Sequence, residues 1–113
     1  MRTVFVTLVG AVLATSAVLA QDAAKIAAGQ KVYADEKCST CHQIAGKGAK
    51  TSPLDGVGAK LSEADIRGWL TNTAAMEAKL SKKPPMSMAT YMKTHKLKDA
   101  DVDALTAYLM SLK

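Results

Sequence analysis

Two cysteines separated by two residues and followed at once by a histidine occur in the segment Cys38-Ser39-Thr40-Cys41-His42. This is the spacing at which a c-type haem is attached covalently. One turn of helix lets both thiols reach the two vinyl groups on one porphyrin edge, and the next residue can turn its imidazole onto the iron. The motif therefore predicts one haem c held by Cys38 and Cys41 through thioether bonds, with His42 as the proximal iron ligand.

Other sites built on a Cys-x-x-Cys pair need surroundings that this sequence does not provide. Cys38 and Cys41 are the only cysteines, and His95 is the only histidine besides His42. A zinc ribbon needs a second pair of ligands, and a thioredoxin-like redox site needs a βαβ setting. Two intervening residues also make a poor span for a structural disulfide. Haem attachment is the interpretation that uses both thiols and the imidazole.

The first twenty residues have the order of a secretory signal. A short positive start, Met1-Arg2, precedes an apolar run from Val4 to Leu13, and small residues lead to Ala20. We predict cleavage after Ala20, which leaves residues 21–113 as one small domain with a periplasmic address in a bacterium. An uncleaved membrane anchor is the alternative, because the whole apolar stretch approaches the length that spans a bilayer.

The size and charge of the chain limit its cofactors and partners. A small domain buries a limited fraction of its surface, so a large and mostly apolar haem would add to its core. The formal net charge is +5, from 15 basic and 10 acidic residues. This balance is too modest and too mixed to favour a nucleic acid as partner. A cationic face could instead steer an acidic protein partner.

Helical periodicity predicts amphipathic helices at both ends of residues 21–113, and no segment is typical of a strand. The first helix runs from Asp22, as N-cap, to about Lys37. Gly29 lies inside it, where glycine costs stability, so we expect a close backbone crossing there. The last helix covers residues 98–112. Its apolar stripe contains Val102, Leu105, Tyr108, Leu109 and Leu112.

A middle helix is predicted to begin after Ser62, which serves as its N-cap. Its apolar face contains Ile66, Trp69 and Leu70. The indole N–H of Trp69 needs a partner when it is buried, and a haem propionate would provide one. Beyond residue 71 the helical spacing either extends this helix or begins a second short one.

Residues 46–58 are predicted to form an irregular loop, because four glycines and a proline occur within them. A loop of this length in a compact domain usually has a function, and here it can wrap the haem. A metal-bound histidine normally donates its second ring N–H to an acceptor. We predict that the carbonyl of Pro53 accepts from His42.

Methionine is the residue expected to fill the second axial position of an iron that has one imidazole ligand. Two methionines lie on helical stripes and are expected to be packing residues: Met76 and Met110. Met86 and Met88 follow paired prolines in a segment predicted to be extended, where residues i and i+2 share a face. Met88 is the predicted distal ligand, and Met86 is the alternative. Met92 and His95 are the third-ranked candidates. His95, flanked by lysines, is expected to be a solvated surface residue.

Several features of residues 21–113 occur together. They are Gly29 and Tyr33, the Cys38–His42 motif, the loop from Pro53 to Val57, the segment from Leu61 to Trp69, and the segment from Asp103 to Leu109. With them, the chain resembles a small class I cytochrome c. The resemblance implies an all-α fold of three to five helices wrapped around one haem. It also implies that the N- and C-terminal helices cross and that Gly29 and Tyr33 meet Tyr108.

The resemblance assigns the same residues to the cofactor. Pro53 and Trp69 would form part of the haem environment, and the Met-x-x-Tyr pattern of Met88 and Tyr91 resembles the distal-ligand segment of the family. The implied function is that of a soluble, monomeric carrier of single electrons. It would be no enzyme itself and would dock with an oxidase, a dehydrogenase or a reductase.

Two other functions stay open at this point. One is a dedicated electron-transfer subunit of a larger oxidoreductase, in which the substrate chemistry belongs to a partner. The other is a catalytic or gas-sensing haem protein, which requires an open or labile sixth position on the iron.

Overall fold

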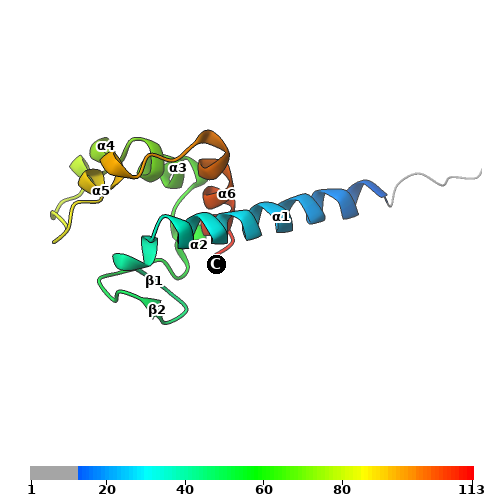
Figure 1. Cartoon of the computed structure of the whole chain (residues 1–113), viewed down its shortest axis with the longest axis horizontal. Helices are drawn as coiled ribbons and strands as arrows, with labels where there is room; N and C mark the ends of the chain where they lie inside the picture. Colours follow the sequence, from blue (N-terminus) through cyan, green and yellow to red (C-terminus); the bar gives the residue numbers. More distant parts are fainter. Residues whose placement is uncertain (1–12) are drawn as a thin grey trace, which may run out of the picture.

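The computed structural model describes residues 13–113, and helices dominate it (Figure 1). The α-helices are α1 (Leu13–Asp35), α2 (Val57–Lys60), α3 (Glu63–Thr71), α4 (Thr73–Ala78), α5 (Met88–Thr94) and α6 (Asp99–Met110), and Cys38–Thr40 forms a short 3₁₀-helix, η1. The predicted helical class is confirmed. The described residues contain more helices than the expected three to five, because α2 is a single turn and the middle helix is split. Asn72 makes that split, since its backbone leaves the helical region (φ −134°, ψ 51°).

The N-terminal helix is longer than predicted. It begins at Leu13, so Asp22 lies inside α1 and is not its N-cap. Residues 1–12 of the predicted signal lie outside the described part of the chain, and cleavage after Ala20 stays a prediction. Within residues 13–113, no helix combines the length and the apolar character that crossing a bilayer requires.

Three short strands also contradict the expectation that no segment would be a strand. They are β1 (His42–Ile44), β2 (Lys47–Gly48) and β3 (Ser52–Pro53), in the order β2-β1-β3. β1 pairs antiparallel with β2 and parallel with β3. The positive φ angles of Ala45 (51°) and Gly46 (78°) are those of a two-residue hairpin turn that matches the twist of its strands. Strands of two or three residues are too short to show an alternating pattern.

The helices at the two ends of the domain cross, as predicted (Figure 1). Gly29 of α1 lies directly on α6, where a Cβ atom on it would stand 2.6 Å from Cβ of Tyr108 and 2.8 Å from the carbonyl carbon of Ala104. The rings of Tyr33 and Tyr108 meet edge to face, with centroids 6.0 Å apart. The expected contact of Gly29 and Tyr33 with Tyr108 is therefore confirmed.

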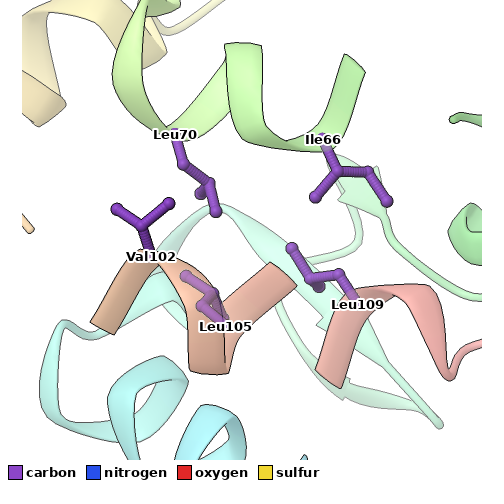
Figure 2. Close-up of a cluster of buried hydrophobic side chains, with 5 residues drawn as sticks. All are labelled: Ile66, Leu70, Val102, Leu105 and Leu109. Carbon is purple, nitrogen blue, oxygen red and sulfur yellow. The ribbon is translucent and has the colours of Figure 1, made fainter. Parts of the chain in front are cut away.

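The core lies between α3 and α6. Its buried side chains are Ile66, Leu70, Val102, Leu105 and Leu109, which point toward one another from the two helices (Figure 2). The hydroxyl of Ser62 accepts from the backbone N–H of Asp65 at 3.1 Å, which confirms Ser62 as the N-cap of α3. Tyr108 and Leu112, the other members of the predicted stripe, are half-buried and pack on this cluster. The core thus anchors α3 and α6, the helices that support the rest of the domain.

Candidate functional site

The two cysteines lie in one tight turn after α1. α1 ends at Asp35, and Lys37 reverses the chain with a left-handed backbone (φ 53°, ψ 39°) before η1 begins at Cys38. The N–H of Cys41 donates to the carbonyl of Cys38 at 3.2 Å, which closes the turn. Both thiols are half-buried, and neither is in a disulfide. The turn therefore presents two free thiols together, as attachment of one porphyrin edge requires.

Cys38 is held in its neutral form. Burial raises the pKa of its thiol to about 11, and the charge of Glu36 acts in the same direction. A thiol with this pKa is almost entirely protonated at neutral pH, so Cys38 contributes a neutral thiol to the turn.

His42 follows this turn as the first residue of β1, and its ring is already oriented. Nδ1 lies 3.0 Å from the backbone carbonyl oxygen of Ser52. A carbonyl can only accept, so the proton is on Nδ1, and the lone pair of Nε2 is available for a metal. A hydrogen bond from the ring nitrogen that does not bind the metal fixes the tautomer and the ring plane of a ligating histidine.

The predicted acceptor for this histidine was wrong by one residue. The carbonyl belongs to Ser52 and not to Pro53. The register explains the difference, because the parallel pairing of β1 with β3 sets His42 opposite Ser52 and Gln43 opposite Pro53. Pro53 itself is exposed, and its place in the haem environment stays a prediction.

The glycine-rich segment is tied to the cysteine turn and is less irregular than predicted. The N–H of Ala49 donates to the carbonyl of Ser39 at 3.0 Å, and the N–H of Ala45 donates to Oδ1 of Asp55 at 2.9 Å. Gly48, at φ 105°, approaches the same Ser39 carbonyl so closely that a Cβ atom would stand 3.1 Å from it. These contacts fix the segment that carries Ser52 against the turn that carries the thiols.

The structure separates the two candidate distal ligands. Ser87 caps α5 by accepting from the N–H of Thr90 at 3.2 Å, so Met88 is the first helical residue. The extended backbone that would have aligned Met86 with Met88 does not continue through Met88. Met88 is half-buried and packs on the core cluster, whereas Met86 is 59% exposed. The burial difference favours Met88. The missed signal was Ser87, a cap residue directly before the helix.

Tyr91, for which the sequence predicted no role beyond the Met-x-x-Tyr pattern, ties α5 to the cysteine turn. Its hydroxyl donates to the carbonyl of Glu36 at 2.6 Å. The ring of His95 stacks on the Tyr91 ring with centroids 3.8 Å apart, and Nδ1 of His95 lies 3.0 Å from the Tyr91 carbonyl. The prediction that His95 is a solvated surface residue is therefore wrong, because it is half-buried. The Met-x-x-Tyr segment thus lies beside the haem motif.

Two further candidate residues, Met92 and Trp69, lie on α5 and α3. Met92 lines a cavity together with Leu70 and Leu97. Trp69 is half-buried on α3, and its carbonyl accepts from the hydroxyl of Thr73 at 2.7 Å. The contact of Trp69 with a haem propionate stays a prediction.

The donor set fits a covalently attached haem. Two free thiols lie in one turn, and the imidazole of His42 is oriented through Nδ1 with Nε2 free. A half-buried thioether, that of Met88, is carried by a helix that hydrogen-bonds to the same turn. Neutral imidazole and thioether are the donors that fill the two axial positions in electron-transferring haem proteins.

The hydroxyl of Tyr33 is buried and has no hydrogen-bond partner within residues 13–113. Burial raises its pKa to about 12, and Cys38 adds to the shift. Below pH 10 the phenol is protonated in the folded and the unfolded chain alike. Between pH 10 and 12 only the unfolded chain releases the proton, so the free energy of unfolding must fall as the pH rises.

Tyr33→Phe should remove this alkaline decline. It should also leave stability at neutral pH unchanged or raise it by about 1 kcal/mol, because an unsatisfied buried hydroxyl is removed. Urea unfolding of wild type and variant at a series of pH values from 8 to about 12 measures both effects. Parallel curves for the two proteins would contradict the assigned role of this hydroxyl.

The comparisons with known proteins bear on the same stretch of chain. The family model described as Cytochrome c matches residues 26–113. The match covers the C-terminal part of α1 from Ile26 onward, the cysteine turn with His42, and α2 to α6. Comparisons with curated proteins and with solved structures gave no match.

Proposed function

Because the chain belongs to the cytochrome c family, we propose that it is a soluble periplasmic carrier that passes single electrons between redox proteins. Haem c with its iron is the cofactor of the family, and Cys38 and Cys41 fit its attachment motif. The observation that carries the proposal is the oriented imidazole of His42 beside two free thiols. The family match supports electron transfer through a haem, and the shuttle role is our proposal.

Each residue of the candidate site would have a separate role in binding the haem. Cys38 and Cys41 would hold the haem through thioether bonds, and the bound haem would supply an iron that gains and loses one electron. His42 is the proximal ligand, and Ser52 keeps its ring oriented. Met88 would be the distal ligand, and its thioether would favour the reduced iron. An iron bound by both His42 and Met88 would leave no vacant site for oxygen or peroxide, which fits an electron carrier that is not an enzyme.

The charge distribution supports docking to a protein partner. Exposed lysines gather in the segment around α4 and α5: Lys79, Lys82, Lys83, Lys93, Lys96 and Lys98. Exposed positive charges of this kind attract an acidic surface and raise the association rate at low salt. We expect an oxidase, a dehydrogenase or a reductase as partner, and a monomeric carrier. The periplasmic address rests on the predicted signal, residues 1–20, and an uncleaved signal would leave the carrier on the membrane.

A dedicated electron-transfer subunit of a larger oxidoreductase is the second candidate. It is favoured by two large apolar side chains exposed close together in the sequence, Leu80 (43%) and Met86 (59%). A subunit would co-purify with its larger partner from the native host. A carrier would instead run as a stable monomer that several donors reduce.

The distal ligand is tested by separate replacements of Met88 and Met86. A ferric haem with a methionine ligand shows a sulfur-to-iron charge-transfer band in the far red. Met88→Ala should abolish this band and let the reduced protein bind carbon monoxide. Met86→Ala is the matched control, and it should leave the band unchanged because Met86 is exposed. Loss of the band in Met86→Ala alone would reassign the ligand, and a wild-type protein without the band would count against the carrier function.

A further inference from the structure

We propose that Glu77 is a positioning residue for the distal ligand: its carboxylate holds the first turn of α5, at which Met88 stands. The proposal rests on the proposed function, because it takes Met88 as the iron ligand. Glu77 lies on α4, far from the cysteine turn in sequence, and nothing in the haem motif points to it. What singles it out is the pair of hydrogen bonds that it accepts.

Glu77 accepts from the residues on both sides of Met88. Its Oε2 lies 3.0 Å from the backbone nitrogen of Ala89 and 3.1 Å from the hydroxyl oxygen of Ser87. Both donors are within one residue of Met88, so the carboxylate fixes the backbone that carries the thioether. Glu77 is half-buried, and hydrogen bonds to a charged group are about twice as strong as neutral ones.

The helix that carries Glu77 is itself anchored to α3. The hydroxyl of Thr73, in the first turn of α4, donates to the carbonyl of Trp69 at 2.7 Å. The side chain of Met76 lies on Gly68, where a Cβ atom would stand 2.9 Å from its sulfur. α3 contributes Ile66 and Leu70 to the core. The hydrogen bonds of Glu77 therefore connect the start of α5, through α4, to the helix that contributes Ile66 and Leu70 to the buried core.

Other contacts hold this start of α5 only weakly. None of the seven residues of α5 is fully buried. The connection from Lys79 to Ser87 contains neither helix nor strand and is largely exposed. Tyr91 ties the next turn of α5 to the carbonyl of Glu36, but it does not fix the first turn. Without Glu77, the N–H of Ala89 would lose its acceptor, and Met88 would be held by its packing on the core cluster and by its own bond to the iron.

The variant Glu77→Ala of the haem-loaded protein should let Met88 leave the iron more often. Loss of a hydrogen bond to a charged group shifts an equilibrium by about tenfold or more, so carbon monoxide should bind to the reduced protein about tenfold faster. On heating, the far-red band should disappear at a lower temperature than the helical signal in circular dichroism. In the wild type the two should be lost together.

Two further variants make the result specific. Glu77→Gln keeps an acceptor oxygen without the charge, so its rate should lie between those of wild type and Glu77→Ala. Glu63→Ala is the matched control, because Glu63 makes an exposed pair with Arg67 at 3.3 Å on the neighbouring helix. It should behave as wild type in both measurements. If Glu77→Ala does not fold, Glu77→Gln carries the same test.

The outcomes separate this proposal from the proposed function. If the band and the helical signal of the Glu77 variants melt together and carbon monoxide binds as in wild type, Glu77 is merely structural and the proposal is overturned. In that case a band that still requires Met88 leaves the carrier function intact. A band that survives Met88→Ala would overturn the proposal for Glu77 and reassign the distal ligand, but it would leave the carrier function intact. A wild-type protein without the band would instead count against the carrier function.

Discussion

Replacing His42 with alanine should abolish the far-red band and convert the iron from a fully ligated to an open state. His42 directly follows the two thiols, and its Nδ1 lies 3.0 Å from the carbonyl oxygen of Ser52, which orients the imidazole. Both Cys38 and Cys41 remain, so the haem should stay covalently attached. The expected result is a coloured protein that binds carbon monoxide readily when reduced. Absorption spectra of the oxidised and reduced variant measure these changes.

The chain offers a matched control for this replacement, its second histidine. Nδ1 of His95 lies 3.0 Å from the Tyr91 carbonyl, and its ring stacks on Tyr91. His95→Ala should lower stability slightly through the loss of these contacts and leave the spectrum as in wild type. A band lost in the His95 variant and kept in the His42 variant would place the proximal ligand elsewhere.

Replacing Gly29 with valine should prevent the chain from reaching its folded state. A Cβ atom at this position would stand 2.6 Å from Cβ of Tyr108 and 2.8 Å from the carbonyl carbon of Ala104. A carbonyl carbon and a Cβ atom are fixed by the backbone of α6, so no side-chain rotation relieves the clash. α1 and α6 would have to separate, at a cost of about 4 kcal/mol or more, which is most of the stability of a small domain. Circular dichroism and urea unfolding measure the loss.

Ala27→Val is the control for the Gly29 replacement. Ala27 is exposed on the same helix, so valine there costs only its lower helix propensity, about 0.5 kcal/mol. If Gly29→Val unfolded at the same urea concentration as Ala27→Val, the close crossing of α1 and α6 would be contradicted.

The sequence predicted well those parts of the fold that repeat a local pattern. The stripe through Val102, Leu105 and Leu109 faces the core, because helical spacing alone sets which residues share a face. Gly29 marked the helix crossing, since a glycine inside a helix costs stability unless the backbone needs the space. The thiols and the imidazole were predictable for the same reason, because their spacing is fixed by the chemistry of attachment.

Contacts between distant polar groups could not be predicted in this way. Which carbonyl accepts from His42 depends on the register of two strands that are too short to leave a pattern, so Pro53 was predicted where Ser52 is found. The bonds from Glu77 to Ser87 and Ala89 span ten and twelve residues. No spacing rule relates a carboxylate to such partners. His95 looked solvated because its neighbours in sequence are lysines, yet Tyr91 covers one face of its ring.

Covalent attachment of the haem is tested by the mass and colour of the exported protein after extraction with acid and acetone. Thioether bonds from Cys38 and Cys41 survive this treatment, whereas a haem held only through its iron is released. The polypeptide should keep its colour, have the mass of residues 21–113 plus one haem, and offer no free thiol to an alkylating reagent. Pigment in the acetone phase, or a folded colourless protein with two reactive thiols, would contradict covalent attachment.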